Sequence, residues 1–175
     1  SMPLLGPVYL GTILKKRAHK VEIYNEDIHK PDYSKLDADL IGISILTSTA
    51  KRGYEIARKF PKEKVIIGGV HASLLQHEAL QVSRQVVVGE ADDVIADVVE
   101  GRKQEPIIYG TPVENLDALP NPDFSLIKGF WPSFLTMPIS TSRGCPFDCS
   151  FCSVTKIFGR KYRFRSAENI IGEMK

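Results

Sequence analysis

Apolar positions in the N-terminal part of the chain form short runs that alternate with stretches of helical spacing. The strongest run is DLIGISIL at residues 39–46, which is apolar at nearly every position and predicts a parallel strand buried on both faces. Shorter runs predict further strands at residues 21–24, 64–67, 85–88 and, as an edge strand, 107–109. Between them, apolar residues recur at helical spacing and predict helices at residues 3–16, 50–60, 72–80 and 91–100.

This alternation predicts an α/β domain with a flavodoxin/Rossmann-like parallel sheet over residues 1–110. Ligands of such sheets bind beyond the carboxyl ends of the strands, where Gly68-Gly69 and Gly89-Glu90 would let a ligand approach the backbone. Such glycines are equally typical of the tight turns that every α/β protein needs. No strand precedes the helix at residues 3–16, so we expect an open sheet, completed by a second chain in a homodimer or locally disordered.

Residues 111–137 differ from this pattern, because they contain several prolines and little helical periodicity. They predict a connector that wraps a surface, since its apolar side chains need cover: Leu116, Leu119, Phe124, Leu126, Ile127, Phe130, Trp131 and Phe134. Residues 138–175 form a third unit. It begins with a predicted strand at residues 138–142 and ends in a helix with Ser166 as its N-cap and Glu168 in its first turn.

The composition changes this picture at one point only. A net charge of +2 argues neither for nor against nucleic acid, and no apolar run approaches the roughly 20 residues that a membrane helix needs. The three cysteines, however, all lie within residues 145–152, an odd number in a window too small for a disulfide framework. They indicate a metal or redox site in a reducing compartment, and so a cytoplasmic protein.

Cys145, Cys149 and Cys152 have the spacing C-x-x-x-C-x-x-C, in which each thiolate can reach a different iron of one small cluster. Iron–sulfur clusters are usually held by four cysteines, so one iron would stay open to a substrate or cofactor. A structural zinc site normally has four protein ligands. Zinc is the weaker alternative, because every histidine that could serve as the fourth ligand lies far upstream of the cysteines. These are His19, His29, His71 and His77.

The loop resembles the cluster-binding loop of the radical S-adenosylmethionine (SAM) superfamily, with Arg143-Gly144 before the first cysteine, Pro146 after it and Phe151 before the third. The resemblance implies that the cysteines bind a 4Fe-4S cluster, that SAM binds its fourth iron, and that Phe151 lies near the adenine. An electron from a flavodoxin or ferredoxin would cleave SAM to a 5′-deoxyadenosyl radical that abstracts hydrogen from an unknown substrate. Residues 138–175 would be the first βα unit of a partial (β/α) barrel.

The preceding residues resemble the cobalamin-binding-like domain that many radical SAM enzymes carry at the N-terminus. The stretches concerned are PVYLGTILKKRAHKVEIYNED, DLIGISILTS, VIIGGVHASLLQHEAL, VVVGEADDVIADVVEG and LDALPNPDFSLI. The resemblance implies that four residues surround the dimethylbenzimidazole tail of cobalamin: Ser44, Leu46, Gly68 and Gly69. It also places His71, Gly89 and Glu90 along the cobalamin cleft, although His71 and Glu90 could equally cap the helices that follow them.

Two further features have alternative interpretations. Asp27-Ile28-His29 follows the second predicted strand and lacks the glycine of the cobalt-ligating fingerprint, so we interpret His29 as a loop residue. Basic and aromatic residues alternate at residues 160–165. They would either grip RNA, as in tRNA-methylthiolating relatives, or form an amphipathic edge that shields the cluster loop. The nearly neutral chain favours the edge.

We therefore expect the intact protein to be a SAM-cleaving enzyme, either a cobalamin-dependent methyltransferase or a carbon-skeleton remodelling enzyme. Residues 1–175 alone should be inactive, because a full barrel needs several more βα units. The alternatives are a non-catalytic binding module, with an apo cobalamin-like domain or a zinc or iron–sulfur site, and an RNA-modifying methylthiotransferase-like protein.

Overall fold

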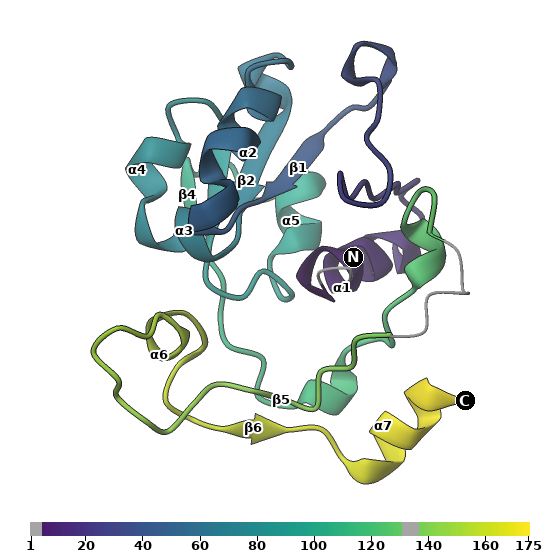
Figure 1. The fold of residues 1–175 in the computed structure, drawn as a ribbon, viewed down its shortest axis with the longest axis vertical. Helices are drawn as coiled ribbons and strands as arrows, with labels where there is room; N and C mark the ends of the chain where they lie inside the picture. Colours follow the sequence, from purple (N-terminus) through teal and green to yellow (C-terminus); the bar gives the residue numbers. More distant parts are fainter. Residues whose placement is uncertain (1–4, 131–136) are drawn as a thin grey trace.

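The computed structural model describes residues 5–130 and 137–175, and its N-terminal part is built around a parallel sheet (Figure 1). Four strands pair side by side in the order β1-β2-β3-β4, and all three pairings are parallel. They are β1 (Ile41–Ser44), β2 (Val65–Gly68), β3 (Gln85–Val88) and β4 (Ile107–Tyr109). The α/β class and the parallel sheet predicted from the sequence are confirmed.

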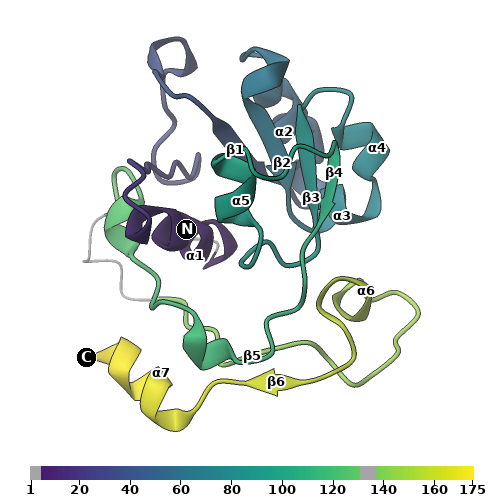
Figure 2. The same ribbon diagram turned by 180° about the vertical axis from the view of Figure 1, so that it is seen from behind.

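Helices cover both faces of the sheet (Figure 2). On one face lie α2 (Ala50–Ala57), α3 (Val70–Leu74) and α4 (Gln76–Ala79), and on the other lie α5 (Ile95–Val99) and α1 (Leu5–Lys16). Successive residues of a strand point to opposite faces, so β2 supplies both cores. Val65 and Ile67 pack toward α2 and α3, whereas Ile66 packs with Val94 and Val98 beside α5.

Two predicted helices are shorter than their apolar periodicity suggests. The helix expected at residues 72–80 is divided into α3 and α4, because Leu75 between them has the non-helical backbone angles φ −127° and ψ 53°. The helix expected at residues 91–100 starts only at Ile95, after a turn closed by the Val94 N–H and the Ala91 carbonyl at 3.1 Å. That turn places Glu90 and Asp92 beside the C-terminal hairpin.

Two strand predictions need correction. Residues 21–24 form no strand, because Ile23 makes only an isolated parallel bridge with Ile127 of the connector. β1 is not buried on both faces. It lies at the edge of the sheet, where α2 covers Ile43 and Ile45 while Gly42 and Ser44 on the opposite face stay exposed.

The connector passes beside α1 and leads into the C-terminal unit, which lies at the lower end of the molecule in Figure 1. The connector contains two short 3-10 turns, Leu116–Ala118 and Phe124–Leu126, and buries Leu116, Leu126 and Ile127, as its composition predicted. Trp131 and Phe134 lie outside the described residues. Among the described helices, none is both long and apolar enough to cross a membrane.

The C-terminal unit contains a two-stranded hairpin and two helices. β5 (Ser142–Arg143) pairs antiparallel with β6 (Arg163–Phe164), and α6 (Val154–Phe158) lies between them in sequence. α7 (Ala167–Met174) begins as predicted, with the Ser166 hydroxyl accepting the Asn169 N–H. The strand expected at residues 138–142 forms only at its end and has an antiparallel partner, so the barrel unit stays a prediction.

The contact between α2 and β1 gives a stability test. A Cβ at Gly53 would lie 2.3 Å from Cγ2 of buried Ile45, which has no room to move. Gly53→Ala should therefore lower the free energy of unfolding in urea by about 1–3 kcal/mol. In α7, a Cβ at Gly172 would meet no atom outside its own helix backbone within 4 Å. Gly172→Ala should therefore raise the free energy of unfolding by about 0.5–1 kcal/mol. Equal effects of the two changes would contradict this close contact.

Candidate functional site

The carboxyl ends of β1 and β2 bring three of the predicted site residues together. Ser44 and Gly68 are register partners at the ends of their strands, and the Gly68 carbonyl accepts the Ile45 N–H at 3.0 Å. Gly69 follows with φ +96°, and a Cβ there would lie 2.7 Å from the Ile45 carbonyl and 3.0 Å from Ser44 Oγ. This position requires glycine, because both the left-handed backbone and the close contacts oppose a side chain.

The end of β3 is tied to the same edge by one serine. Ser73 Oγ donates to the Gly69 carbonyl at 2.9 Å and accepts the Gly89 N–H at 3.0 Å. Ser44 is exposed here, and Leu46 keeps 37% of its surface exposed. We call the set Ser44, Leu46, Gly68, Gly69 and Gly89 the glycine edge. It offers backbone and small side chains at the end of the sheet where ligands of parallel α/β folds bind.

His71 lies beside the glycine edge but faces the helices. Its imidazole is buried, with Nδ1 3.2 Å from Thr47 Oγ1 and Nε2 3.4 Å from Glu78 Oε1. The Tyr54 ring lies edge-on to it, with 6.1 Å between ring centroids. His71 therefore joins α2, α3 and α4, and it does not cap α3. His29, interpreted as a loop residue, lies in a loop.

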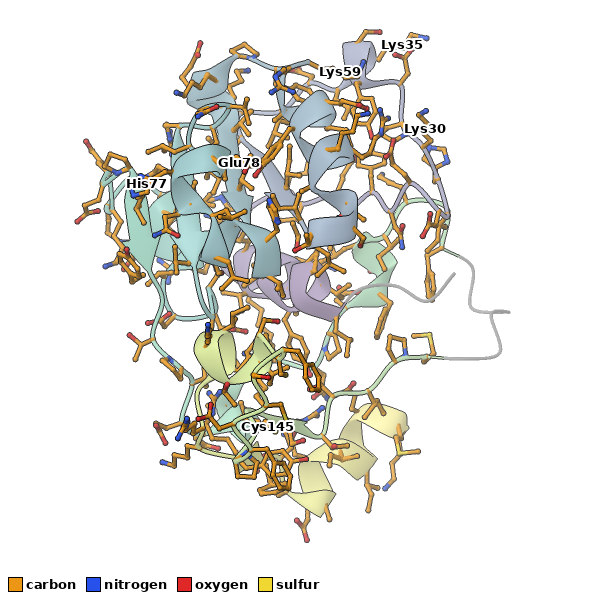
Figure 3. The ribbon with its side chains drawn as sticks, turned by 60° about the vertical axis from the view of Figure 1, so that its left-hand side comes forward. Lys30, Lys35, Lys59, His77, Glu78 and Cys145 are labelled. Atoms are coloured by element: carbon orange, nitrogen blue, oxygen red, sulfur yellow. The ribbon has the colours of Figure 1, made fainter. Side chains whose placement is uncertain are left out.

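The cysteine loop lies on the hairpin, between β5 and α6. All three thiols are free, with Cys145 and Cys152 half-buried and Cys149 exposed. The Cys145 N–H donates to the Gly159 carbonyl at 3.3 Å, and the Cys152 N–H to the Cys149 carbonyl at 3.0 Å. Phe151 is 92% exposed, so its ring is free to meet a ligand. Figure 3 shows Cys145 on the hairpin and His77 on α4, at separate places on the molecule.

The donor set of this loop fits an iron–sulfur cluster. Three free thiols come from one loop, and thiolates are the ligands that hold such clusters. Within residues 5–130 and 137–175, no three His, Cys, Asp or Glu side chains come close enough to share a single metal ion.

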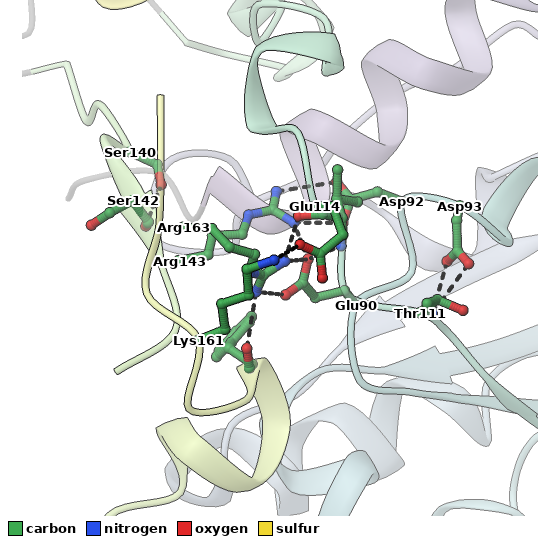
Figure 4. A network of polar contacts seen from close by, with 12 residues as sticks. Glu90, Asp92, Asp93, Thr111, Glu114, Ser140, Ser142, Arg143, Lys161 and Arg163 are labelled. Atoms are coloured by element: carbon green, nitrogen blue, oxygen red, sulfur yellow. Dashed lines mark hydrogen bonds and ion pairs between the residues drawn. The ribbon is translucent and has the colours of Figure 1, made fainter. Parts of the chain in front are cut away.

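Two acidic residues after β3 hold two arginines of the hairpin (Figure 4). Arg143 Nη1 donates to Glu90 Oε2 at 2.9 Å and to Asp92 Oδ2 at 2.7 Å, and its Nη2 donates to Asp92 Oδ1 at 3.1 Å. Arg163 donates to both oxygens of Glu90, at 3.1 Å for Oε2, and also to the Val113 carbonyl at 2.6 Å. We call Glu90, Asp92, Arg143 and Arg163 the Glu90 clamp.

The Glu90 clamp is buried, and its charges balance. The side chain of Glu90 is fully buried and that of Arg163 is 2% exposed. Burial alone raises the pKa of Glu90, but hydrogen bonds from Arg163, from the Val113 N–H and from Arg143 outweigh it and hold that pKa below its usual value. In this structure the Glu90 carboxylate pairs with two arginines of the hairpin, and its place along a cobalamin cleft stays a prediction.

The basic run at residues 160–165 is neutralised within the chain. Each of its four cations has a carboxylate partner: Arg160 with Asp148, Lys161 with Glu114, Arg163 with Glu90, and Arg165 with Glu173. Arg163 and Arg165 are buried. The burial of Arg163 and Arg165 favours the amphipathic edge over an RNA-binding surface, because only Arg160 and Lys161 of the run are exposed to a phosphate backbone.

Comparison with known proteins identifies the N-terminal part. Residues 1–99, more than half of the chain, match the model of the B12 binding domain. The chain belongs to the B12-binding domain family. This confirms the resemblance to radical SAM enzymes with a cobalamin-binding-like domain ahead of the cysteine loop.

Two curated relatives match most of the chain. It is 32% identical to bacteriochlorophyllide d C-8(2)-methyltransferase of Chlorobaculum tepidum over 87% of this chain and 36% of that protein. It is 26% identical to an anaerobic magnesium-protoporphyrin IX monomethyl ester cyclase of Rubrivivax gelatinosus over 86% of this chain and 33% of that protein. The chain thus spans about a third of the length of these relatives.

Further matches are more limited. Hopanoid C-3 methylase of Methylococcus capsulatus is 51% identical over 37 residues, which is 21% of this chain and 7% of that protein. Among solved structures, the N-terminal domain of a hypothetical protein of Thermotoga maritima matches with a TM-score of 0.44 and 16% identity, over 59% of this chain and 88% of that one.

The buried clamp predicts unequal effects from two arginines of the same run. Arg163→Met leaves the Glu90 carboxylate buried without its main partner, so the free energy of unfolding in urea should fall by about 3–5 kcal/mol at neutral pH. Arg160→Met removes only an exposed pair with Asp148 and should leave stability nearly unchanged.

The same pair of variants gives a pH test. Because the folded-state pKa of Glu90 is lowered, its stabilisation is fully present above the usual value of 4.5 and is lost as pH falls through the lowered pKa. The gap in stability between wild type and Arg163→Met should therefore shrink in acid. A gap that is constant with pH would show that Arg163 stabilises the hairpin by packing alone.

Proposed function

We propose that the intact protein is a radical SAM enzyme that binds cobalamin at the glycine edge and a 4Fe-4S cluster on the cysteine loop. The observation that carries this proposal is the Glu90 clamp, which fastens the cysteine loop directly to the carboxyl edge of a B12-binding domain. The clamp joins the loop after β3 to both strands of the hairpin. Such a clamp would keep the two cofactors close enough to act on a common substrate, and proximity of reacting groups lowers the barrier of a reaction.

The chain's own residues would divide the work. Cys145, Cys149 and Cys152 would hold three irons and leave the fourth open to SAM, and Phe151 would contact the adenine. When bound, the cluster supplies the electron that breaks a carbon–sulfur bond of SAM. Ser44, Leu46 and the glycines of the glycine edge would admit the dimethylbenzimidazole tail of cobalamin.

The names of the relatives support methyl transfer or a related carbon-skeleton reaction as the overall chemistry. A flavodoxin or ferredoxin would supply the electron, and the reaction would take place in a reducing cytoplasm. A non-catalytic module that merely binds cobalamin or a metal is the alternative. It would hold its ligand without any response to SAM, and so it can be separated from the enzyme by experiment.

The cluster can be tested by anaerobic reconstitution with iron and sulfide. Wild type should bind about four irons per chain and give, after reduction, an electron paramagnetic resonance signal that shifts when SAM is added. Cys149→Ala should lose the bound iron and the SAM-responsive signal. Ser150→Ala, which changes the exposed neighbour of Cys149, should keep the bound iron and the signal. Stoichiometric zinc, or iron with no response to SAM, would overturn the radical SAM assignment for this chain.

Cobalamin binding can be tested separately by titrating the protein with hydroxocobalamin and recording its absorbance. Ser44 is exposed at the glycine edge, so Ser44→Leu should lower the affinity about tenfold or more without unfolding the sheet. Glu63→Leu changes an exposed residue before the amino end of β2 and should have no effect. Saturable binding that both variants retain would place cobalamin elsewhere on the molecule.

A further inference from the structure

We propose that Glu90 is a positioning residue for Cys145: the loop that ends β3 sets the place of the first cluster ligand. The inference rests on the proposed function in one respect, namely that Cys145 binds a cluster iron. Two separate chains of contacts lead from the Glu90 carboxylate to Cys145.

The first chain of contacts passes through β5. Arg143, held by Glu90 and Asp92, is separated from Cys145 by Gly144 alone. Gly144 has φ +86°, and a Cβ there would lie 2.2 Å from the Lys161 carbonyl oxygen. The backbone between Arg143 and Cys145 is therefore packed against the segment just before β6 and has little freedom to move independently.

The second chain of contacts passes through the residues before β6. Arg163, held by Glu90, also donates to the Phe158 carbonyl at 2.9 Å. Gly159, the next residue, accepts the Cys145 N–H at 3.3 Å. The segment that hydrogen-bonds the cysteine backbone is thus fixed by the same carboxylate that holds Arg143.

Glu90 itself has a fixed position. Gly110 packs so closely on it that a Cβ at Gly110 would lie 1.6 Å from the Glu90 carbonyl oxygen. The Val113 N–H also donates to Glu90 Oε2 at 3.2 Å. Since Glu90 directly follows Gly89, the residue that holds the cysteine loop is covalently joined to the glycine edge. A shift of that edge would be transmitted to the first cysteine.

The test is the alkylation rate of each cysteine in the protein without cluster, under anaerobic conditions. The protein is treated with iodoacetamide, and each site is followed by peptide mass spectrometry. In Glu90→Gln, buried Arg163 and half-buried Arg143 lose their common counter-charge, so open forms of the hairpin become more populated. Half-buried Cys145 should react about tenfold faster than in wild type. Exposed Cys149 should change by less than about twofold in the same molecules.

Two further variants separate positioning from general loosening. Glu114→Gln makes the same chemical change on a carboxylate that pairs with the hairpin through exposed Lys161, and it should leave the Cys145 rate as in wild type. Glu90→Asp keeps the charge and should restore much of the protection. If Glu90→Gln does not fold, as judged by circular dichroism, Asp92→Asn replaces it and should accelerate Cys145 less strongly, because Glu90 and Arg163 remain paired.

An unchanged Cys145 rate in folded Glu90→Gln, or equal acceleration in Glu114→Gln, would overturn the positioning role. Uniform acceleration of Cys145 and Cys152 would also overturn it, since that result indicates loosening of the whole loop. Reconstitution of wild type answers the other question. If wild type binds no SAM-responsive cluster, the proposed function fails, while the alkylation result still decides whether Glu90 positions Cys145.

Discussion

The structure depends on one buried carboxylate that is shared by two arginines. A charged group loses its hydration when it is buried, and only well-placed opposite charges make up for that loss. Glu90 meets this condition with both of its oxygens, since Arg163 donates to each and Arg143 to one. Separating the hairpin from the sheet would leave an unpaired charge on each surface. The cysteine loop is therefore held to the B12-binding domain by electrostatics that do not tolerate partial opening.

The position of this carboxylate follows from the way parallel strands end. β1, β2 and β3 run in the same direction, so their last residues reach the same edge of the sheet. Glycines there let the chain turn sharply with positive φ, as at Gly69 and Gly89. The turn after Gly89 brings Glu90 back beneath Gly110, so its carboxylate faces the hairpin and not the solvent. The glycine edge and the Glu90 clamp are thus formed by the same set of loops.

Much of the fold could be predicted because its signals are local. Buried parallel strands read as continuous apolar runs, and the strands β2, β3 and β4 formed where these runs lie. The cysteine loop was recognised from its spacing within residues 145–152. The expectation that β1 is buried on both faces is wrong, because the composition of a strand does not say whether it lies in the middle or at the edge of the sheet. The bridge of Ile23 to Ile127 was missed for a related reason, since its partner lies in the connector.

The clamp could not have been predicted, because its members are far apart in sequence. Glu90 lies 53 positions before Arg143 and 73 before Arg163, and no periodic pattern connects them. The sequence points to Glu90 as a cleft residue or a helix cap and not as a partner of arginines, and it gives no signal for Asp92. The contact of Arg143 with Tyr9, whose ring centroid lies 5.4 Å from the guanidinium, could not be predicted for the same reason. Only a known sheet order shows that the loop after β3 faces the hairpin.

The hairpin also reverses the usual direction of an amphipathic strand. In residues 162–165 the arginines point inward, and Tyr162 and Phe164 point outward, 48% and 64% exposed, with ring centroids 4.3 Å apart. Hydrophobic periodicity alone would have turned the aromatic face toward the core. The arginines face inward because carboxylates meet them at the sheet edge. Apolar surfaces can slide past one another, whereas a guanidinium bound to two fixed carboxylates defines a single register. An ionic contact is therefore better suited than an apolar one to hold Cys145 at a fixed place relative to the glycine edge.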